Sequence, residues 1–235
     1  DDFKAHLNEK TRMVIINTPH NPSGKVFSDS DMLMLQSCLK DTDIILLSDE
    51  VYEHIVFDKH SHESASKYPD LASRSFVCAS FGKTFHATGW KMGYCAGPEL
   101  LMKEFRNVHQ FNVFSVNHPV QRALSVYLKD AGNYLSLPDF FQEKRDKFLG
   151  AIQGSGFSFT PSKGTYFQLL NYENISDEHD VVLAKKWTRE LKLASIPVSV
   201  FYHQKTDHKV LRFCFAKSEE TLMRGAAILN KIKSS

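Results

Sequence analysis

The chain has 235 residues, of which 42% are hydrophobic, and a formal net charge of +2. A chain of this size and composition can bury a core in one large or two small domains. The balanced charge gives no reason to expect nucleic acid or a membrane surface as a partner, and no apolar run approaches the roughly 18 residues of a membrane-spanning helix. A small-molecule partner is therefore expected.

The cysteines and histidines show no metal-binding or disulfide pattern. Cys38, Cys78, Cys95 and Cys214 are widely separated, and the 11 histidines contain no paired spacing typical of a metal site. We therefore expect reduced cysteines, no metal and a cytoplasmic location. The chain opens without an initiator Met and reaches a strand pattern almost at once, so we expect it to be truncated at its N-terminus.

Short apolar runs in the first half predict strands. Between the first two runs Ser28 is a candidate helix N-cap, and Met32, Leu35 and Leu39 recur on one face of the helix that would follow. Near-continuous apolar runs favour strands buried on both faces, and a strand–helix–strand order favours a parallel sheet. The predicted strands are Met13–Asn17, Ile44–Leu47, Phe76–Ala79 and Met92–Ala96.

The second half predicts a smaller α+β domain. Pro119 and Pro138 stand where helices can begin. Short strands and helices then follow in mixed order, which is typical of an α+β domain. We place a large domain at residues 1–130 and a small one at 131–235. The predicted strands are Tyr166–Leu170, Ile196–Val200 and Val210–Phe215, and the predicted helices are Val181–Leu191 and Ser218–Ile232.

Four polar stretches follow strands or lie in glycine-containing loops, where an open α/β sheet binds ligands. Each has a simpler interpretation when taken alone: a proline-rich turn for the first, a solvated strand edge or helix cap for Asp49 and Glu50, and an exposed surface lysine for Lys83. Arg212 stands between two apolar residues, so a strand would turn it to the opposite face. The stretches are Asn17–Gly24, Ser48–Tyr52, Ser80–Thr84 with Thr88–Gly93, and Arg212–Phe215.

The order and spacing of these motifs resemble the class I/II aminotransferases, which are fold-type I pyridoxal-phosphate enzymes. Within that family the chain looks most similar to methionine aminotransferases and kynurenine–oxoglutarate (glutamine) transaminases. The resemblance implies an α/β fold, with a three-layer large domain around a mainly parallel sheet and a smaller α+β C-terminal domain. The matching motifs are Asn17–Pro22, Ser48–His54, Ser80–Thr84, Gly89–Tyr94 and Phe114–Asn117.

The resemblance implies a role for each of four residues around the pyridoxal 5'-phosphate ring. Lys83 corresponds to the lysine that holds the cofactor as a Schiff base and then moves the proton at the substrate α-carbon. Asp49 corresponds to the aspartate that pairs with the pyridine nitrogen. Tyr52 and Asn21 correspond to the two groups that hydrogen-bond the phenolic oxygen of the ring.

Further residues are implied at the phosphate and at the substrate. Ser80 and Lys91 correspond to phosphate contacts, and a lysine at position 91 also occurs in the similar subgroup. Arg212 corresponds to the arginine that binds the substrate α-carboxylate, for which a planar guanidinium is suited, and Asn21 is also expected at the substrate. Asn117 and Tyr94 are weaker candidates, because Asn117 can simply cap a helix and Tyr94 can be a core residue.

The function implied by the resemblance is transfer of an amino group from methionine, an aromatic amino acid or glutamine to a 2-oxo acid, in a homodimer. Three alternatives remain open: a cysteine-conjugate β-lyase that uses the same site, an aminotransferase-like sensor domain of a transcriptional regulator, and a non-catalytic binding module. In the family, a glycine-containing phosphate turn and an aromatic residue that stacks on the cofactor precede the segment at which this chain begins. Side-chain specificity is therefore not predicted.

Overall fold

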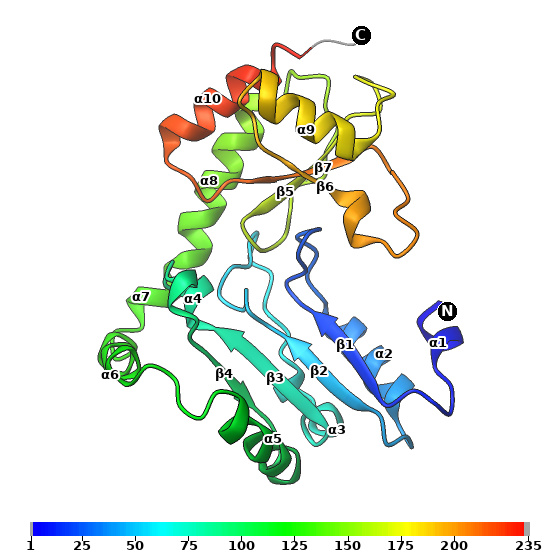
Figure 1. The fold of residues 1–235 in the computed structure, drawn as a ribbon, viewed down its shortest axis with the longest axis vertical. Helices are drawn as coiled ribbons and strands as arrows, with labels where there is room; N and C mark the ends of the chain where they lie inside the picture. Colours follow the sequence, from blue (N-terminus) through cyan, green and yellow to red (C-terminus); the bar gives the residue numbers. More distant parts are fainter. Residues whose placement is uncertain (1, 233–235) are drawn as a thin grey trace. The chain divides into compact units, whose positions relative to one another are not determined.

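The computed structural model describes residues 2–232, and these fall into two units (Figure 1). Unit 1 contains the chain up to Pro19 together with Val26–Leu137. Unit 2 contains His20–Lys25 and the chain from Pro138 onward. The division therefore follows Leu137, and the domain boundary after residue 130 stays a prediction.

Unit 1 is built on a four-stranded sheet with the order β1-β2-β3-β4. The first three strands are parallel and β4 is antiparallel to β3, so the sheet is mainly parallel (Figure 1). The four predicted strands are confirmed, with ends that differ by at most two residues. The strands are β1 Met13–Asn17, β2 Ile45–Asp49, β3 Ser75–Ser80 and β4 Gly93–Ala96.

Helix α2 (Asp29–Leu39) begins at the predicted cap. The Ser28 hydroxyl accepts from the Asp31 backbone N–H, and the Asp31 carboxylate accepts from the Ser28 N–H, which forms a capping box. The apolar face of α2 packs on one face of the sheet, called here the covered face. The core of this layer contains Val14, Ile16, Met32, Leu35, Leu39, Ile44, Leu46, Ala65, Tyr68 and Leu71.

The opposite face of β1 is exposed among the described residues. Met13 and Ile15 are 43% and 68% exposed, so the expectation that the strands are buried on both faces is wrong for β1. Alternation along the strand places these side chains away from α2, where no described element covers them. The expectation is also wrong for β4, in which no residue is buried.

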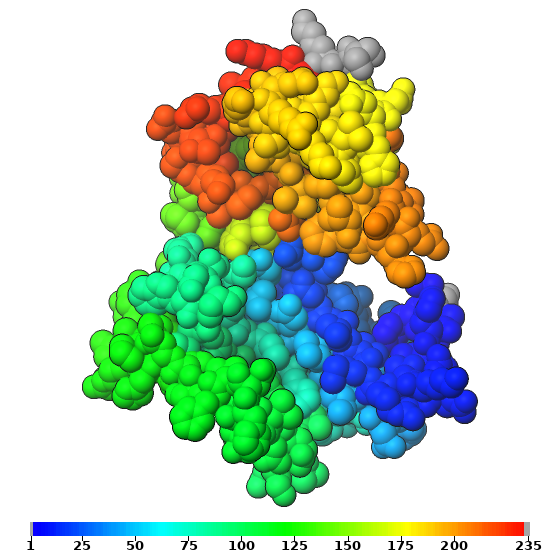
Figure 2. All heavy atoms as spheres, viewed as in Figure 1, coloured from blue at the N-terminus to red at the C-terminus, as the bar shows by residue number. Residues whose placement is uncertain are grey.

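An unpredicted helix, α5 (Glu99–Asn112), lies at the surface of unit 1, as the green segment in Figure 2 shows. None of its residues is buried, and Leu100 and Phe111 are 80% and 87% exposed. The remaining helices of unit 1 are α1 Asp2–His6, α3 Pro69–Ala72, α4 Phe81–Thr84, α6 His118–Tyr127 and α7 Gly132–Leu135, with 3-10 turns η1 Ala65–Lys67 and η2 Thr88–Trp90.

Unit 2 has an antiparallel three-stranded sheet with the order β5-β7-β6. In β7, Leu211 and Phe213 are buried and Arg212 takes the other face, as the alternation predicts. Helix α8 starts at the last residue of unit 1 and continues into unit 2. The elements are α8 Leu137–Ile152, β5 Phe167–Asn171, α9 Asp180–Glu190, β6 Ile196–Pro197, η3 Val198–Phe201, β7 Val210–Cys214 and α10 Glu219–Leu229.

The predicted strand Ile196–Val200 is wrong after Pro197, where the chain turns into η3. The Asp180 carboxylate, which is fully buried, accepts from the Ser199 backbone N–H at 2.8 Å and from the Ser199 hydroxyl at 2.7 Å. This charge-assisted pair favours the turn over continued strand pairing.

The sequence-based expectations for membrane-spanning helices and for the cysteines can be compared with the structure. Within residues 2–232, no helix is both long and apolar enough to cross a membrane. All four cysteines are free thiols.

Candidate functional site

The end of β2 presents Asp49 at the carboxyl edge of the unit 1 sheet. Its backbone carbonyl accepts from Asn17 Nδ2 at 2.9 Å and from the Thr18 N–H at 3.1 Å. Its Oδ1 accepts from the Val51 N–H at 3.3 Å. Burial raises the pKa of Asp49 above its ordinary value, against the opposing effects of the Val51 hydrogen bond and the Lys83 charge.

Lys83 lies on α4, directly after β3, and its amine is close to Tyr52. The distance from Lys83 Nζ to the centre of the Tyr52 ring is 6.0 Å, and Tyr52 is only 2% exposed. Strands β2 and β3 are parallel neighbours, so the segments that follow them emerge at the same edge of the sheet. Unit 1 thus brings together a primary amine, a phenol and the half-buried Asp49 carboxylate.

Ser80 and Lys91 flank the pairing of β3 with β4. Ser80 is the last residue of β3 and is paired with Gly93, two positions after Lys91. Lys91 is exposed and has a left-handed backbone, with φ of 52°. A Cβ at Gly93 would lie 2.5 Å from the Ala79 carbonyl oxygen, so this approach of the two strands requires glycine.

Unit 2 brings together the other two predicted residues, Asn21 and Arg212. Arg212 Nη1 donates to Asn21 Oδ1 at 2.6 Å. The guanidinium carbon lies 4.0 Å from the centre of the Phe167 ring and 5.7 Å from that of Phe201. These rings can stabilise the cation by cation–π interaction. The two aromatic partners are not predicted from the sequence.

The loop that carries Asn21 is fixed to unit 2 through Gly24. The Gly24 carbonyl accepts from the N–H groups of Lys163 and Gly164 at 2.9 and 3.0 Å. Gly24 has φ of 68°, and a Cβ there would lie 2.4 Å from the Ser162 Cβ. Only glycine fits this close approach without strain.

The structure decides the alternatives for the two weaker candidates. Asn117 caps α6, because its Oδ1 accepts from the Val120 N–H at 3.1 Å, so the capping interpretation is confirmed. Tyr94 is 41% exposed, so the core interpretation is wrong. Its hydroxyl donates to Glu53 Oε1 at 2.8 Å.

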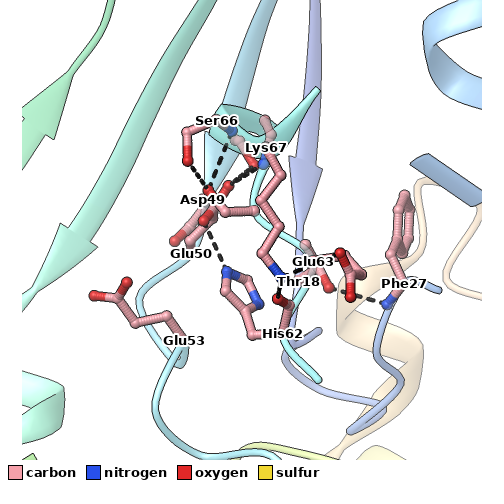
Figure 3. Close-up of polar contacts among 12 residues, drawn as sticks. Thr18, Phe27, Asp49, Glu50, Glu53, His62, Glu63, Ser66 and Lys67 are labelled. Carbon is pink, nitrogen blue, oxygen red and sulfur yellow. Dashed lines mark hydrogen bonds and ion pairs between the residues drawn. The ribbon is translucent and has the colours of Figure 1, made fainter. Parts of the chain in front are cut away.

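A buried network behind Asp49 is the main feature that the sequence reasoning missed. Glu50 is 1% exposed, so its interpretation as a solvated edge or helix cap is wrong. Its Oε1 accepts from Ser48 Oγ at 2.7 Å and from the Ala65 N–H at 2.9 Å. Its Oε2 lies 2.7 Å from His62 Nε2, a contact drawn in Figure 3. Ser48, Glu50, His62 and Ala65 are called here the Glu50 network. No sequence motif pointed to His62.

One cluster of metal-type ligands occurs among residues 2–232, at His179, Asp180 and Asp207. Its carboxylates are engaged by the protein itself. Asp180 accepts from Ser199, and Asp207 accepts from the backbone N–H of Lys209 at 2.8 Å. This cluster is therefore explained as an internal hydrogen-bond network.

The chain matches known proteins along nearly its whole length. The sequence profile of the family described as "Aminotransferase class I and II" matches residues 1–229. Methionine aminotransferase of Escherichia coli is 44% identical over 232 residues, covering 98% of this chain and 60% of that protein. Human kynurenine–oxoglutarate transaminase 1 is 32% identical over 254 aligned positions, covering 99% of this chain and 60% of that protein. The chain thus spans about 60% of the length of these curated relatives.

Solved structures give the same result for the fold. The E. coli protein YbdL, for which a methionine aminotransferase function is described, superposes with a TM-score of 0.95 at 44% identity, over 98% of this chain and 61% of that chain. N-succinyldiaminopimelate aminotransferase of Mycobacterium tuberculosis superposes with a TM-score of 0.92 at 28% identity, over 98% of this chain and 60% of that chain. The fold is the α/β aminotransferase fold. On its sequence and its fold alike, this chain belongs to the class I and II aminotransferase family.

Proposed function

We propose that the whole protein is a pyridoxal-phosphate-dependent aminotransferase that moves the amino group of methionine, an aromatic amino acid or glutamine to a 2-oxo acid. Family membership and the methionine and kynurenine transaminase relatives support the reaction and the substrate class. The structural observation that carries the proposal is the Lys83 amine, 6.0 Å from the centre of the Tyr52 ring, in the same unit as the half-buried carboxylate of Asp49.

The chemistry of these side chains fits the cofactor. An aldehyde requires a primary amine, which Lys83 offers, and a protonated ring nitrogen requires a carboxylate, which Asp49 offers. A phenolic oxygen is matched by the hydroxyl of Tyr52. When bound, pyridoxal phosphate supplies the electron sink that stabilises negative charge at the substrate α-carbon.

The residues of unit 1 would bind the cofactor and move the proton. In the proposed reaction, the Lys83 amine would take a proton from the α-carbon of the substrate as a general base and deliver it to the cofactor carbon as a general acid. Asp49 would hold a proton at the ring nitrogen, and Tyr52 would donate a hydrogen bond to the phenolic oxygen. Ser80 would donate to the phosphate, and Lys91 would supply a positive charge to it.

Arg212 and Asn21 of unit 2 would orient the substrate. The guanidinium of Arg212 can donate two parallel hydrogen bonds to the α-carboxylate that every amino-acid and oxo-acid substrate carries. Its Nη1 is oriented by Asn21 Oδ1 at 2.6 Å, which fixes the plane of the group before substrate binds. Asn21 is further proposed to contact the phenolic oxygen of the cofactor.

Two further parts of the proposal concern assembly and location. The exposed Leu100 and Phe111 of α5 form apolar surface of the kind found at subunit contacts, which supports a homodimer. The four free thiols agree with the proposed cytoplasmic location, where cysteines remain reduced.

The test is attachment of the cofactor to Lys83 in the full-length protein. Pyridoxal phosphate is added, the product is reduced with borohydride, and the modified peptide is identified by mass spectrometry. We expect the label on Lys83 and none in Lys83→Ala. Lys91→Ala is the matched control, because it removes a lysine from the same site but keeps the amine that reacts. Methionine and a 2-oxo acid are then added to the unreduced protein, and the new amino acid is measured.

Two outcomes would contradict the proposal. A label that persists in Lys83→Ala would remove Lys83 from its role. Pyruvate and ammonia formed from a cysteine conjugate without any oxo acid, together with no amino transfer, would identify a β-lyase instead.

A further inference from the structure

The Glu50 network lies on the covered face of the unit 1 sheet, immediately behind Asp49. Burial in β2 alternates, so that Leu46, Ser48 and Glu50 are buried while the side chain of Asp49 takes the opposite face. The bond from Ser48 Oγ to Glu50 Oε1 confirms that these two side chains share a face. The neighbouring residues Asp49 and Glu50 thus lie on opposite faces of the sheet.

Glu50 is held by donors from three different parts of unit 1. Ser48 belongs to β2 itself, Ala65 begins η1, and His62 lies on the loop between these two elements. The Glu50 backbone is fixed as well, because its N–H donates to the Cys78 carbonyl of β3 at 2.7 Å. The end of β2 is therefore tied to its neighbour strand and to the layer behind it.

We propose that Glu50 and His62 are positioning residues, which fix the end of β2 so that Asp49 is held in place for the ring nitrogen of the cofactor. The inference rests on the proposed function. It adds two residues that would not touch cofactor or substrate and would act only through Asp49.

The charges around this pair support ionised Glu50. Burial alone would raise the pKa of Glu50, but the hydrogen bond and charge of His62, with the donors Ala65 and Ser48, hold it below its ordinary value. A buried carboxylate in this state needs its partners, because an unpaired charge is strongly unfavourable in the interior. Removing His62 would therefore force the Glu50 carboxylate either to take up a proton or to move, and a movement would displace the end of β2.

Other titratable groups also face His62. His54 interacts with it electrostatically, and Glu53 lies beside His54, with 3.8 Å between Glu53 Oε1 and His54 Nε2. Lys67 Nζ donates to the His62 carbonyl at 2.7 Å and pairs with Glu63 at 3.2 Å. These side chains remain in the variants below, so a change in pH response is attributable to position 62.

The experiment compares His62→Leu and His62→Gln with the wild-type holoenzyme. Leucine removes the donor to Glu50, whereas glutamine keeps an N–H near the position of Nε2. The readouts are the dissociation constant of pyridoxal phosphate, the pH midpoint of the absorbance band of the lysine-bound cofactor, and the unfolding temperature without cofactor. Tyr68→Phe is the matched control, because it removes partly buried hydrogen bonds to Asp29 and Glu63 without touching Glu50 or Asp49.

We expect His62→Leu to weaken cofactor binding about tenfold, the scale on which outer partners act on ligating groups. The pH midpoint should move upward, because a ring nitrogen that loses its carboxylate loses its positive charge, and that charge favours deprotonation of the attached nitrogen. His62→Gln should recover most of both effects. Tyr68→Phe should lower the unfolding temperature and leave affinity and midpoint unchanged.

An unchanged affinity and midpoint in His62→Leu, with only a lower unfolding temperature, would overturn the positioning role. If His62→Leu does not fold, an unchanged affinity and midpoint in Glu50→Gln would overturn it. Absence of the absorbance band in the wild-type protein would instead contradict the proposed function, so the two failures are distinguishable.

Discussion

Arg212 and Asn21 are joined by a hydrogen bond of 2.6 Å although 191 positions separate them in the sequence. The bond fixes one edge of the guanidinium, and the Phe167 ring lies 4.0 Å from its carbon atom. A side chain that is already oriented loses less entropy when a carboxylate binds. Four predictions follow from this site and from the structure around it.

Arg212→Lys should weaken substrate binding, because an ammonium group cannot replace the planar pair of donors. Charge-assisted hydrogen bonds contribute about 2 kcal/mol, so we expect KM for both amino acid and oxo acid to rise roughly 30-fold. Cofactor attachment should not change. Steady-state kinetics check this, with Arg224→Lys on the exposed face of α10 as control. An unchanged KM would remove Arg212 from substrate binding.

Gly24→Ala should destabilise unit 2 by about 2 kcal/mol, because φ of 68° is strained for alanine and the new Cβ would lie 2.4 Å from that of Ser162. Thermal unfolding measures the change. Gly154→Ala is the control, since no atom lies within 4 Å of its Cβ position. Equal stability of the two variants would show that the loop moves aside without cost.

Ser28→Ala should cost about 1 kcal/mol of stability, because it removes the acceptor for the first turn of α2. Urea unfolding gives the difference in free energy. Ser37→Ala, at an exposed position inside the same helix, should have no cost, since alanine favours helix. A comparable loss at both positions would argue against the capping box as the cause.

Glu50 should make stability depend on pH in the acid range. Its pKa in the folded state lies below the ordinary value of 4.5, so its contribution is present above pH 4.5 and is lost as the pH falls through the folded value. Glu50→Gln should be about 2 kcal/mol less stable at pH 7 and should lose less stability on acidification. Glu143→Gln, at a side chain that is 67% exposed, is the control. Parallel curves for wild type and Glu50→Gln between pH 5 and about 3 would contradict this.

Local patterns were sufficient for most elements. The apolar run Met13–Asn17 is strand β1 as predicted, and Ser28 caps the predicted helix. Helix α5 was missed because its N-cap is Pro98, which offers no side-chain acceptor and therefore no start signal. The β-branched residues Val198 and Val200 favour a strand, but the buried Asp180 binds Ser199 and forms a turn instead.

The candidate residues that belong to contiguous motifs could be predicted from the sequence. Those that join the site only through packing could not. Lys83, Asp49 and Tyr52 lie close together in unit 1, and the order of their motifs predicted that they would. His62 lies on a loop 12 residues from Glu50, and nothing local distinguishes it from other histidines. Glu50 is buried because the segment with His62 and Ala65 packs against the end of β2, and such tertiary packing is not visible in a local sequence pattern.

Asp49 and Glu50 lie on opposite faces of the sheet, and this arrangement limits how the length of the chain can change at the end of β2. Deleting one residue from β2 would exchange the two faces, so that the carboxylate proposed to bind the cofactor would enter the core and the buried carboxylate would leave it. A single substitution in β2 keeps the other side chains on their faces, whereas an insertion or a deletion moves all the side chains beyond it to the opposite face. The exposed turn at Tyr202–Thr206 carries no such constraint, so sequences of different loop length should be tolerated there.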